Sequence, residues 1–307
     1  MAPLDRALEA ASSQIRSSRT VTPTVQAFFD ESTFTASYVV WDGDTKRAAI
    51  VDSVLDYDPA SGYTTTSSAD RIIAYVLERG LGIDWLLETH AHADHLSAAT
   101  YLKDRLGGQI GIGRSITKVQ QDFGALFNIR PDDACDGSAF DRLFEDGDRF
   151  DMGELVATVL HVPGHTAADL AYVIGDVAFV GDTIFMPDVG TARADFPGGD
   201  AGTLYRSIRR LLSLPEQTIL FLCHDYKAPG RETFAWRATV ADQRRRNVHV
   251  HDGVGEASFV AMRTARDASL GTPRLILPSI QVNMRAGRMP SPEANGLRYL
   301  KIPVNAL

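Results

Sequence analysis

The segment "LLETHAHADHLS", from Leu86 to Ser97, concentrates three of the chain's eight histidines within six residues. The stretch "IDWLLETH" that leads into it is typical of a buried strand, and "LSAATYLKDRLGG" behind it is typical of a helix that ends at glycine. The polar residues of the loop between them are His90, His92, Asp94 and His95.

This loop has the composition of a metal site. Burying several imidazoles and a carboxylate without partners would cost several kcal/mol. A shared cation removes that cost, because neutral imidazole nitrogen and carboxylate oxygen are ordinary ligands of zinc and iron. His90 and His92 can point to one side of an extended or turned loop, while Asp94 and His95 begin the next helix. We therefore expect this loop to bind metal.

Three more potential ligands stand at the ends of other predicted strands. They are His165 in "HVPGHT", Asp182 in "FVGDTIF" and His224 in "LFLCHDY". Strand ends are where loops collect side chains into a site, so we expect these residues to join the loop. Strand alternation predicts that Cys223, next to His224, points to the opposite face. His161, His249 and His251 are expected to be ordinary histidines.

The rest of the chain alternates between strand and helix patterns. "VQAFFD", "TASYVVW" and "RAAIVDS" are typical of strands, "SSADRIIAYVLERG" has helical spacing, and "LAYVIGDVAFVGD" predicts a hairpin. These patterns favour an α/β sandwich of mixed sheets covered by helices, formed by one domain over residues 24–307. Residues 1–23 are expected to form a flexible or loosely docked tail.

Composition limits the cellular location and the classes of partner that we expect. The net charge of −8 disfavours general binding to nucleic acid or anionic lipid. No apolar run approaches the ~20 residues that span a bilayer. Two cysteines in 307 residues give no disulfide framework. We therefore expect a cytoplasmic protein without membrane or nucleic-acid partners.

Four motifs, "THAHADH", "PGHT", "GDTIF" and "CHDY", follow each other in the order that the metallo-β-lactamase superfamily has. Each comes after a predicted strand, so the chain resembles this superfamily. The resemblance implies an αββα sandwich, with two mixed sheets flanked by helices and the metal at one edge between the sheets. The superfamily includes hydrolases and oxygenases, so the activity depends on smaller features.

The flanking stretches resemble the persulfide dioxygenases, in particular the bacterial branch named β-lactamase-like hydrolases. These stretches are "AAIVDSV", "GTARADFPGGDAGTLYRSI", "CHDYKAPG" and "PSIQVNMRAG". The resemblance implies one ferrous iron bound by His90, His165 and Asp182. It implies oxidation by O2 of glutathione persulfide, or of a similar small thiol persulfide, to sulfite and the thiol. A homodimer is consistent with the same family.

The resemblance also suggests roles for residues around the iron. His92, Asp94, His95 and His224 would surround it without binding it. Glutathione carries two carboxylates, so cationic partners are expected. The candidate substrate contacts are Arg193, Arg285 and the hydroxyl of Tyr226.

Two other interpretations remain open. A dinuclear zinc hydrolase of thioesters (as in glyoxalase II), lactones or β-lactams would use the same residues. His90, His92 and His165 would hold one zinc, Asp94, His95 and His224 the other, and Asp182 would bridge them. A member of the family that only binds a partner would need no metal. Metal analysis separates the three, because they predict one iron, two zincs or none.

Overall fold

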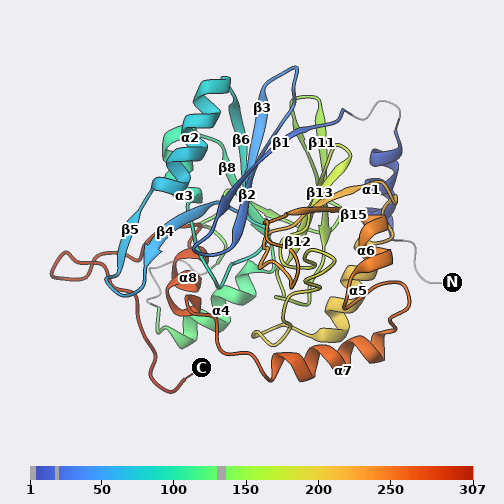
Figure 1. The fold of residues 1–307 in the computed structure, drawn as a ribbon. Helices are drawn as coiled ribbons and strands as arrows, with labels where there is room; N and C mark the ends of the chain where they lie inside the picture. Colours follow the sequence, from blue (N-terminus) through green and yellow to red (C-terminus); the bar gives the residue numbers. More distant parts are fainter. Residues whose placement is uncertain (1–4, 18–20, 130–135, 307) are drawn as a thin grey trace.

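A computed structural model describes residues 5–17, 21–129 and 136–306 of the protein. Two six-stranded mixed sheets face each other, and helices cover both outer faces (Figure 1). The predicted αββα sandwich is therefore confirmed. Among the described residues, no helix is both long enough and apolar enough to cross a membrane.

The first sheet has the strand order β1-β2-β3-β6-β8-β9. The strands are β1 (Thr24–Asp30), β2 (Thr35–Trp41), β3 (Arg47–Val51), β6 (Gly82–Leu87), β8 (Gln109–Gly113) and β9 (Arg142–Phe144). The pairs β1·β2 and β2·β3 are antiparallel, and the remaining neighbours are parallel. Every residue of β2 is buried, which explains its almost continuous apolar sequence.

The second sheet has the order β10-β11-β12-β13-β14-β15. The strands are β10 (Arg149–Met152), β11 (Leu155–His161), β12 (Leu170–Ile174), β13 (Val177–Phe179), β14 (Ile219–Phe221) and β15 (Arg237–Thr239). Only β13·β14 is parallel. The predicted hairpin is β12·β13, and Gly175 in its turn has φ 59°, a left-handed conformation that favours glycine.

Three hydrophobic clusters hold the layers together. The cluster between the sheets is rich in aromatic side chains, such as Tyr38, Phe144, Tyr172 and Phe179. One helical layer packs on the first sheet and consists of α2 (Ser67–Arg79), α3 (Ala99–Leu106), α4 (Ile116–Leu126) and α8 (Ile276–Asn283). The layer beside the second sheet contains α1 (Arg6–Arg16), α5 (Ala201–Leu211), α6 (Val240–Arg246) and α7 (Glu256–Asp267).

A small sheet of β5 (Tyr63–Thr65), β4 (Val54–Asp58) and β7 (Leu96–Ser97) closes one end of the sandwich. Strand β7 follows the histidine loop directly and pairs with β4, with Val54 opposite Ser97. The histidine loop is therefore anchored at both ends, because β6 before it and β7 after it are each paired with another strand.

The prediction of a flexible or loosely docked tail is wrong for the part of residues 1–23 that forms α1. Asp5 caps this helix, and Ala7, Ala11 and Ile15 bury one face against the second sheet. The Gln14 side chain donates to the carbonyl oxygens of three residues of the sheet, which are Val156, Val173 and Gly175. The small alanines made this apolar stripe hard to recognise in the sequence.

Candidate metal centre

The predicted ligands come from both sheets. The histidine loop follows β6 of the first sheet, whereas His165, Asp182 and His224 follow β11, β13 and β14 of the second. Gly181 allows the two sheets to approach here: its φ is 52°, and a Cβ atom added to it would lie 2.6 Å from Thr89 Oγ1. The strand ends thus gather their polar residues at one edge between the sheets.

His90, His165 and Asp182 form what we call the first donor group. One ligand atom from each lies within 4.8 Å of the others, and all three residues are buried. Asp182 Oδ2 is 3.5 Å from His165 Nε2 and 3.9 Å from His90 Nε2. Metal bonds of about 2.0–2.2 Å place neighbouring ligand atoms roughly 3–4 Å apart, so the spacing suits one ion.

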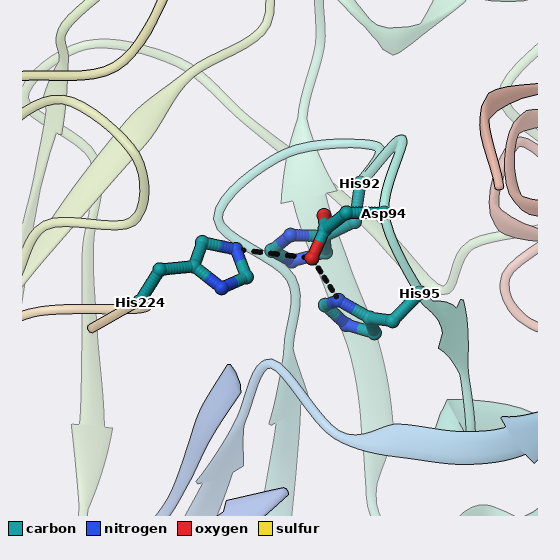
Figure 2. A group of neighbouring side chains, drawn as sticks. All are labelled: His92, Asp94, His95 and His224. Carbon is teal, nitrogen blue, oxygen red and sulfur yellow. Dashed lines mark hydrogen bonds and ion pairs between the residues drawn. The ribbon is translucent and has the colours of Figure 1, made fainter. Parts of the chain in front are cut away.

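His92, Asp94, His95 and His224 form the second donor group, again within 4.8 Å of one another. Figure 2 shows the Asp94 carboxylate between His224 and His95, with Oδ2 at 3.3 Å from His224 Nε2 and 3.4 Å from His95 Nδ1. Asp182 Oδ1 lies 3.3 Å from His224 Nε2, so this carboxylate presents one oxygen to each group.

The structure places His92 differently from the dinuclear division that the sequence allowed. That division assigned His92 to the same ion as His90 and His165, but His92 belongs to the second donor group. Its Nε2 lies 3.0 Å from Asp52 Oδ1 and is engaged there.

Unpartnered atoms show that both groups fit a cation. Among the described residues, several buried ligand atoms have no hydrogen-bond partner: His90 Nε2, His92 Nδ1, His95 Nε2, Asp182 Oδ1 and His224 Nε2. Leaving such atoms buried and unpaired is costly, and a metal ion is the partner that nitrogen and carboxylate ligands share.

For His90 and Asp94, the surroundings favour the protonation states that a cation requires. Burial lowers the pKa of His90 well below its ordinary value, and the neighbouring His92 and His165 lower it further. Burial would raise the pKa of Asp94, but His224 and His95 outweigh it and hold that pKa well below the usual range. A neutral imidazole and an ionised carboxylate are the forms that bind metal.

Hydrogen bonds on the far side of each ring orient the ligands. His165 Nδ1 donates to the Arg193 carbonyl at 2.8 Å, and His224 Nδ1 donates to the Phe34 carbonyl at 3.1 Å. His90 Nδ1 lies 3.0 Å from Thr89 Oγ1, whose hydroxyl donates to Asp52. In each case Nε2 is left with its lone pair facing the centre.

Two residues that support the loop were missed from the sequence. Asp52 receives the backbone N–H and the hydroxyl of Thr89 as well as His92. The amide of Asn283 donates to the carbonyls of His92 and His95, both at 2.8 Å, and accepts the N–H of Ser97. They occur in "AAIVDSV" and "PSIQVNMRAG", which carried part of the resemblance without an assigned role.

A cavity of about 470 Å³ opens onto the metal centre. Asp94, His165 and Asp182 lie in its wall, together with apolar side chains that include Phe185 and Phe196. Tyr226 lines the cavity, and its ring stacks on His224 with centroids 5.8 Å apart. A contact between its hydroxyl and a substrate stays a prediction.

Arg193 also lines this cavity, although its guanidinium already has partners. It donates to both oxygens of Asp195, at 2.6 and 2.7 Å, and to the Gly271 carbonyl at 2.8 Å. A contact between Arg193 and a substrate stays a prediction.

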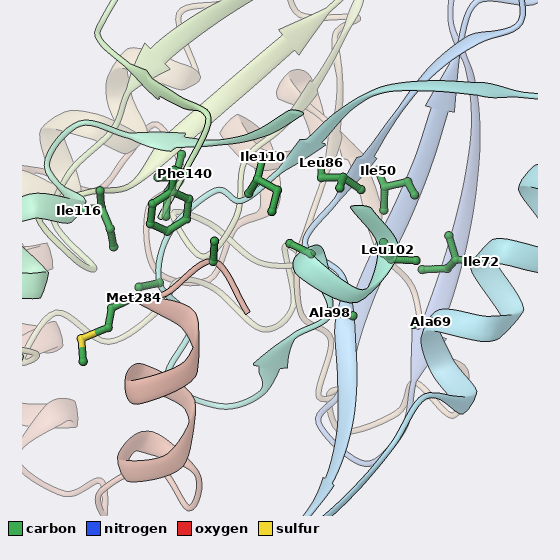
Figure 3. Packing of buried hydrophobic residues seen from close by; sticks show 14 of the residues in the cluster. Ile50, Ala69, Ile72, Leu86, Ala98, Leu102, Ile110, Ile116, Phe140 and Met284 are labelled. Atoms are coloured by element: carbon green, nitrogen blue, oxygen red, sulfur yellow. The ribbon is translucent and has the colours of Figure 1, made fainter. Parts of the chain in front are cut away.

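Arg285 does not lie with the other candidates. It lines a small separate cavity with Gln281, and its Nη1 donates to the Gln281 carbonyl. Met284, the residue before it, packs in the hydrophobic cluster that also contains Ile116 and Phe140 (Figure 3). The prediction of a shared substrate site is therefore not supported for Arg285, because the motif directs Asn283, and not Arg285, at the metal loop.

The prediction that Cys223 points to the opposite face from His224 is wrong. Strand β14 ends at Phe221, so strand alternation no longer applies at Cys223. Its buried sulfur lies within 4.8 Å of ligand atoms of Asp182 and His224. The histidines expected to be ordinary have ordinary partners: His161 meets the Ala167 carbonyl, His249 accepts from Thr191, and His251 accepts from Gly253.

Comparisons with known proteins agree with this geometry. Residues 32–224 match the family model described as "Metallo-beta-lactamase superfamily". A Burkholderia pseudomallei protein named "Probable metallo-hydrolase" is 58% identical over 92% of this chain and 100% of its own length. "Glyoxylase B2" of Dictyostelium discoideum is 47% identical over 92% of this chain and 97% of its own.

Two further matches are more distant. The human mitochondrial persulfide dioxygenase ETHE1 is 26% identical, covering 86% of this chain and 88% of its own. The crystal structure of ETHE1 from Myxococcus xanthus superposes with a TM-score of 0.69 and 28% identity, covering 86% of this chain and 100% of that one. Together with the donor groups at the edge of the αββα sandwich, these matches show that the chain belongs to the metallo-β-lactamase superfamily.

Proposed function

We propose that the protein is a persulfide dioxygenase. It would convert glutathione persulfide, O2 and water into glutathione and sulfite, with release of two protons when sulfite is the dianion. Both O2 atoms and one water oxygen end on the outer sulfur, and the S–S bond breaks. The observation that carries this proposal is the separate first donor group, in which two histidines and one carboxylate meet without His92.

The residues of this group would bind ferrous iron through His90 Nε2, His165 Nε2 and Asp182. Such a triad supplies open coordination positions at which a sulfur ligand and O2 can meet. The protein's own contribution is positional. The hydrogen bonds to the Arg193 carbonyl and to Thr89 orient two of the rings, and Phe185 and Phe196 shield the cavity from water.

A dinuclear metallo-hydrolase is the second candidate function. The second donor group is a complete set of ligands, and Asp182 turns one oxygen to each group. The relatives with 58% and 47% identity have the names of a metallo-hydrolase and a glyoxylase, whereas the human persulfide dioxygenase is 26% identical. In that case a metal-activated hydroxide would attack a thioester.

Paired assays on one preparation separate the two candidates. The protein is loaded with iron or with zinc, and both forms receive glutathione persulfide and S-lactoylglutathione. O2 consumption with stoichiometric sulfite, seen only in the iron form, supports the dioxygenase. Rapid thioester hydrolysis without O2 uptake by the iron form would overturn it. His251→Gln, which removes a histidine outside both donor groups, is the matched control.

A further inference from the structure

Four cationic side chains line the cavity in front of the metal centre, and two of them are already neutralised. Arg193 forms its ion pair with Asp195. Arg263 is buried and pairs with Asp267 at 2.6 Å, and it also donates to the Thr191 carbonyl. These two arginines brace the wall through contacts within the protein.

The other two cations, Lys227 and Arg266, have no carboxylate partner within the part of the chain that the structure describes. Arg266 lies on the exposed side of α7 at the cavity wall. The Lys227 ammonium lies over the Phe234 ring, 4.1 Å from its centroid. The backbone of Lys227 has φ 59°, and its N–H donates to Asp225 Oδ1, so its loop is held in a defined shape.

The carboxylates that line the same cavity already have other partners. Asp94 and Asp182 belong to the donor groups, and Asp188 forms an ion pair with Arg231. The outer part of the cavity therefore keeps unbalanced positive charge. Burial lowers the pKa of His249, behind this wall, to about 4, and the charges of Arg263 and Arg266 add to the effect.

We propose that Lys227 and Arg266 each anchor one of two separate carboxylates of a small thiol-derived substrate. They stand on different segments, the loop after His224 and the helix α7, with apolar Phe185, Phe196 and Leu270 in the same cavity. A compound with acidic groups at both ends and a sulfur between them matches this pattern, as glutathione derivatives do. The inference rests on the proposed function only in taking such a compound as the substrate.

Calorimetric binding to the metal-loaded protein tests the inference without turnover. Glutathione and its diethyl ester, in which both carboxylates are masked, are titrated into wild type, Lys227→Gln and Arg266→Gln. A charge-assisted contact is worth about tenfold or more in Kd, so each variant should lose that much glutathione affinity. The ester should bind weakly and about equally to all three.

Arg245→Gln is the matched control, because it removes one positive charge from α6, at a residue outside the cavity. It should bind glutathione like the wild type. Unchanged glutathione affinity in either cavity variant, tight binding of the ester, or no binding by the wild type would each overturn the inference. A failed O2 assay leaves these results intact, because the titrations involve no oxidation.

Discussion

The metal centre, which we call the floor because the cavity opens onto it, and the outer wall of the cavity are both rich in charged and titratable residues, but these residues find their partners in opposite ways. On the floor, ligand atoms such as His90 Nε2 and His224 Nε2 are buried without a hydrogen-bond partner among the residues that the structure describes. On the wall, Arg193 and Arg263 each have a carboxylate and a carbonyl partner. The ligand atoms of the floor thus suit a cation as their shared partner, whereas two of the four cationic side chains of the wall already have carboxylate partners within the protein.

This difference teaches which residues should affect function and which should affect folding. Removing a ligand from the floor should release the ion while the fold remains. Removing a paired arginine from the wall should weaken the fold while the ion remains.

The largest expected effect is loss of the ion from the first donor group. His90→Ala and Asp182→Ala should lose nearly all bound iron and all activity, because each removes one of three ligands. Inductively coupled plasma mass spectrometry of the purified variants measures metal content, and circular dichroism checks the fold. A wild-type iron content in either variant would remove it from the set of ligands.

The second donor group should respond less strongly. Asp94→Ala and His224→Ala should keep close to one iron per chain, with activity reduced by about 10–100-fold, as for residues around a metal site. The same metal analysis decides the point. If the wild type holds two metals and Asp94→Ala holds one with all activity gone, the protein is dinuclear.

On the wall, Arg193→Ala should lower the free energy of unfolding by about 1–3 kcal/mol, because the Asp195 carboxylate and the Gly271 carbonyl lose their donor. Iron content should not change. Denaturant unfolding measures the free energy of unfolding of the wild type, Arg193→Ala and Arg266→Gln. The value for Arg266→Gln should stay within about 0.5 kcal/mol of that of the wild type. Equal stability of wild type and Arg193→Ala, with weakened glutathione binding, would make Arg193 a substrate contact instead.

The smallest effect concerns His249 behind the wall. Its folded-state pKa of about 4 lies below its ordinary value of 6.5, so between these pH values the unfolded chain binds the proton more readily. This histidine should therefore destabilise the protein as the pH falls from 6.5 to 4, with no contribution above 6.5. Melting temperatures across this range should show a shallower decline in His249→Gln. Identical slopes would assign the acid sensitivity to other groups.

The sequence predicted the metal ligands far better than the residues that hold the histidine loop in place. The donors were expected near one another because each follows a strand and strand ends converge at one edge of the sandwich, and the resemblance to the persulfide dioxygenases then singled out His90, His165 and Asp182. Asp52 and Asn283 could not be chosen, because they act on the loop through contacts that span 40 and 191 residues of chain. Local patterns do not contain such long-range contacts.

The wrong predictions for Cys223, Arg285 and helix α1 also concern features that local sequence patterns do not contain. Cys223 was misplaced because β14 ends two residues earlier than its apolar sequence suggests. Arg285 was misplaced because the end of α8 decides which side chain of the "NMR" motif reaches the loop. Helix α1 was missed because small residues, Ala7, Ala11 and Ser12, supply most of its buried face.

The origin of the ligands in different sheets has a mechanical consequence. His90 follows a strand of one sheet, while His165 and Asp182 follow strands of the other. An ion held by all three would add a link between two sheets that already meet through side-chain packing and a few backbone hydrogen bonds, such as those from Leu170 N–H to the Thr89 carbonyl and from Ala36 N–H to the Cys223 carbonyl. Chelation should therefore loosen the sandwich at this edge, and amide hydrogen exchange should accelerate first at the ends of β6, β11 and β13. The metal would thus stabilise this edge of the sandwich locally as well as support activity.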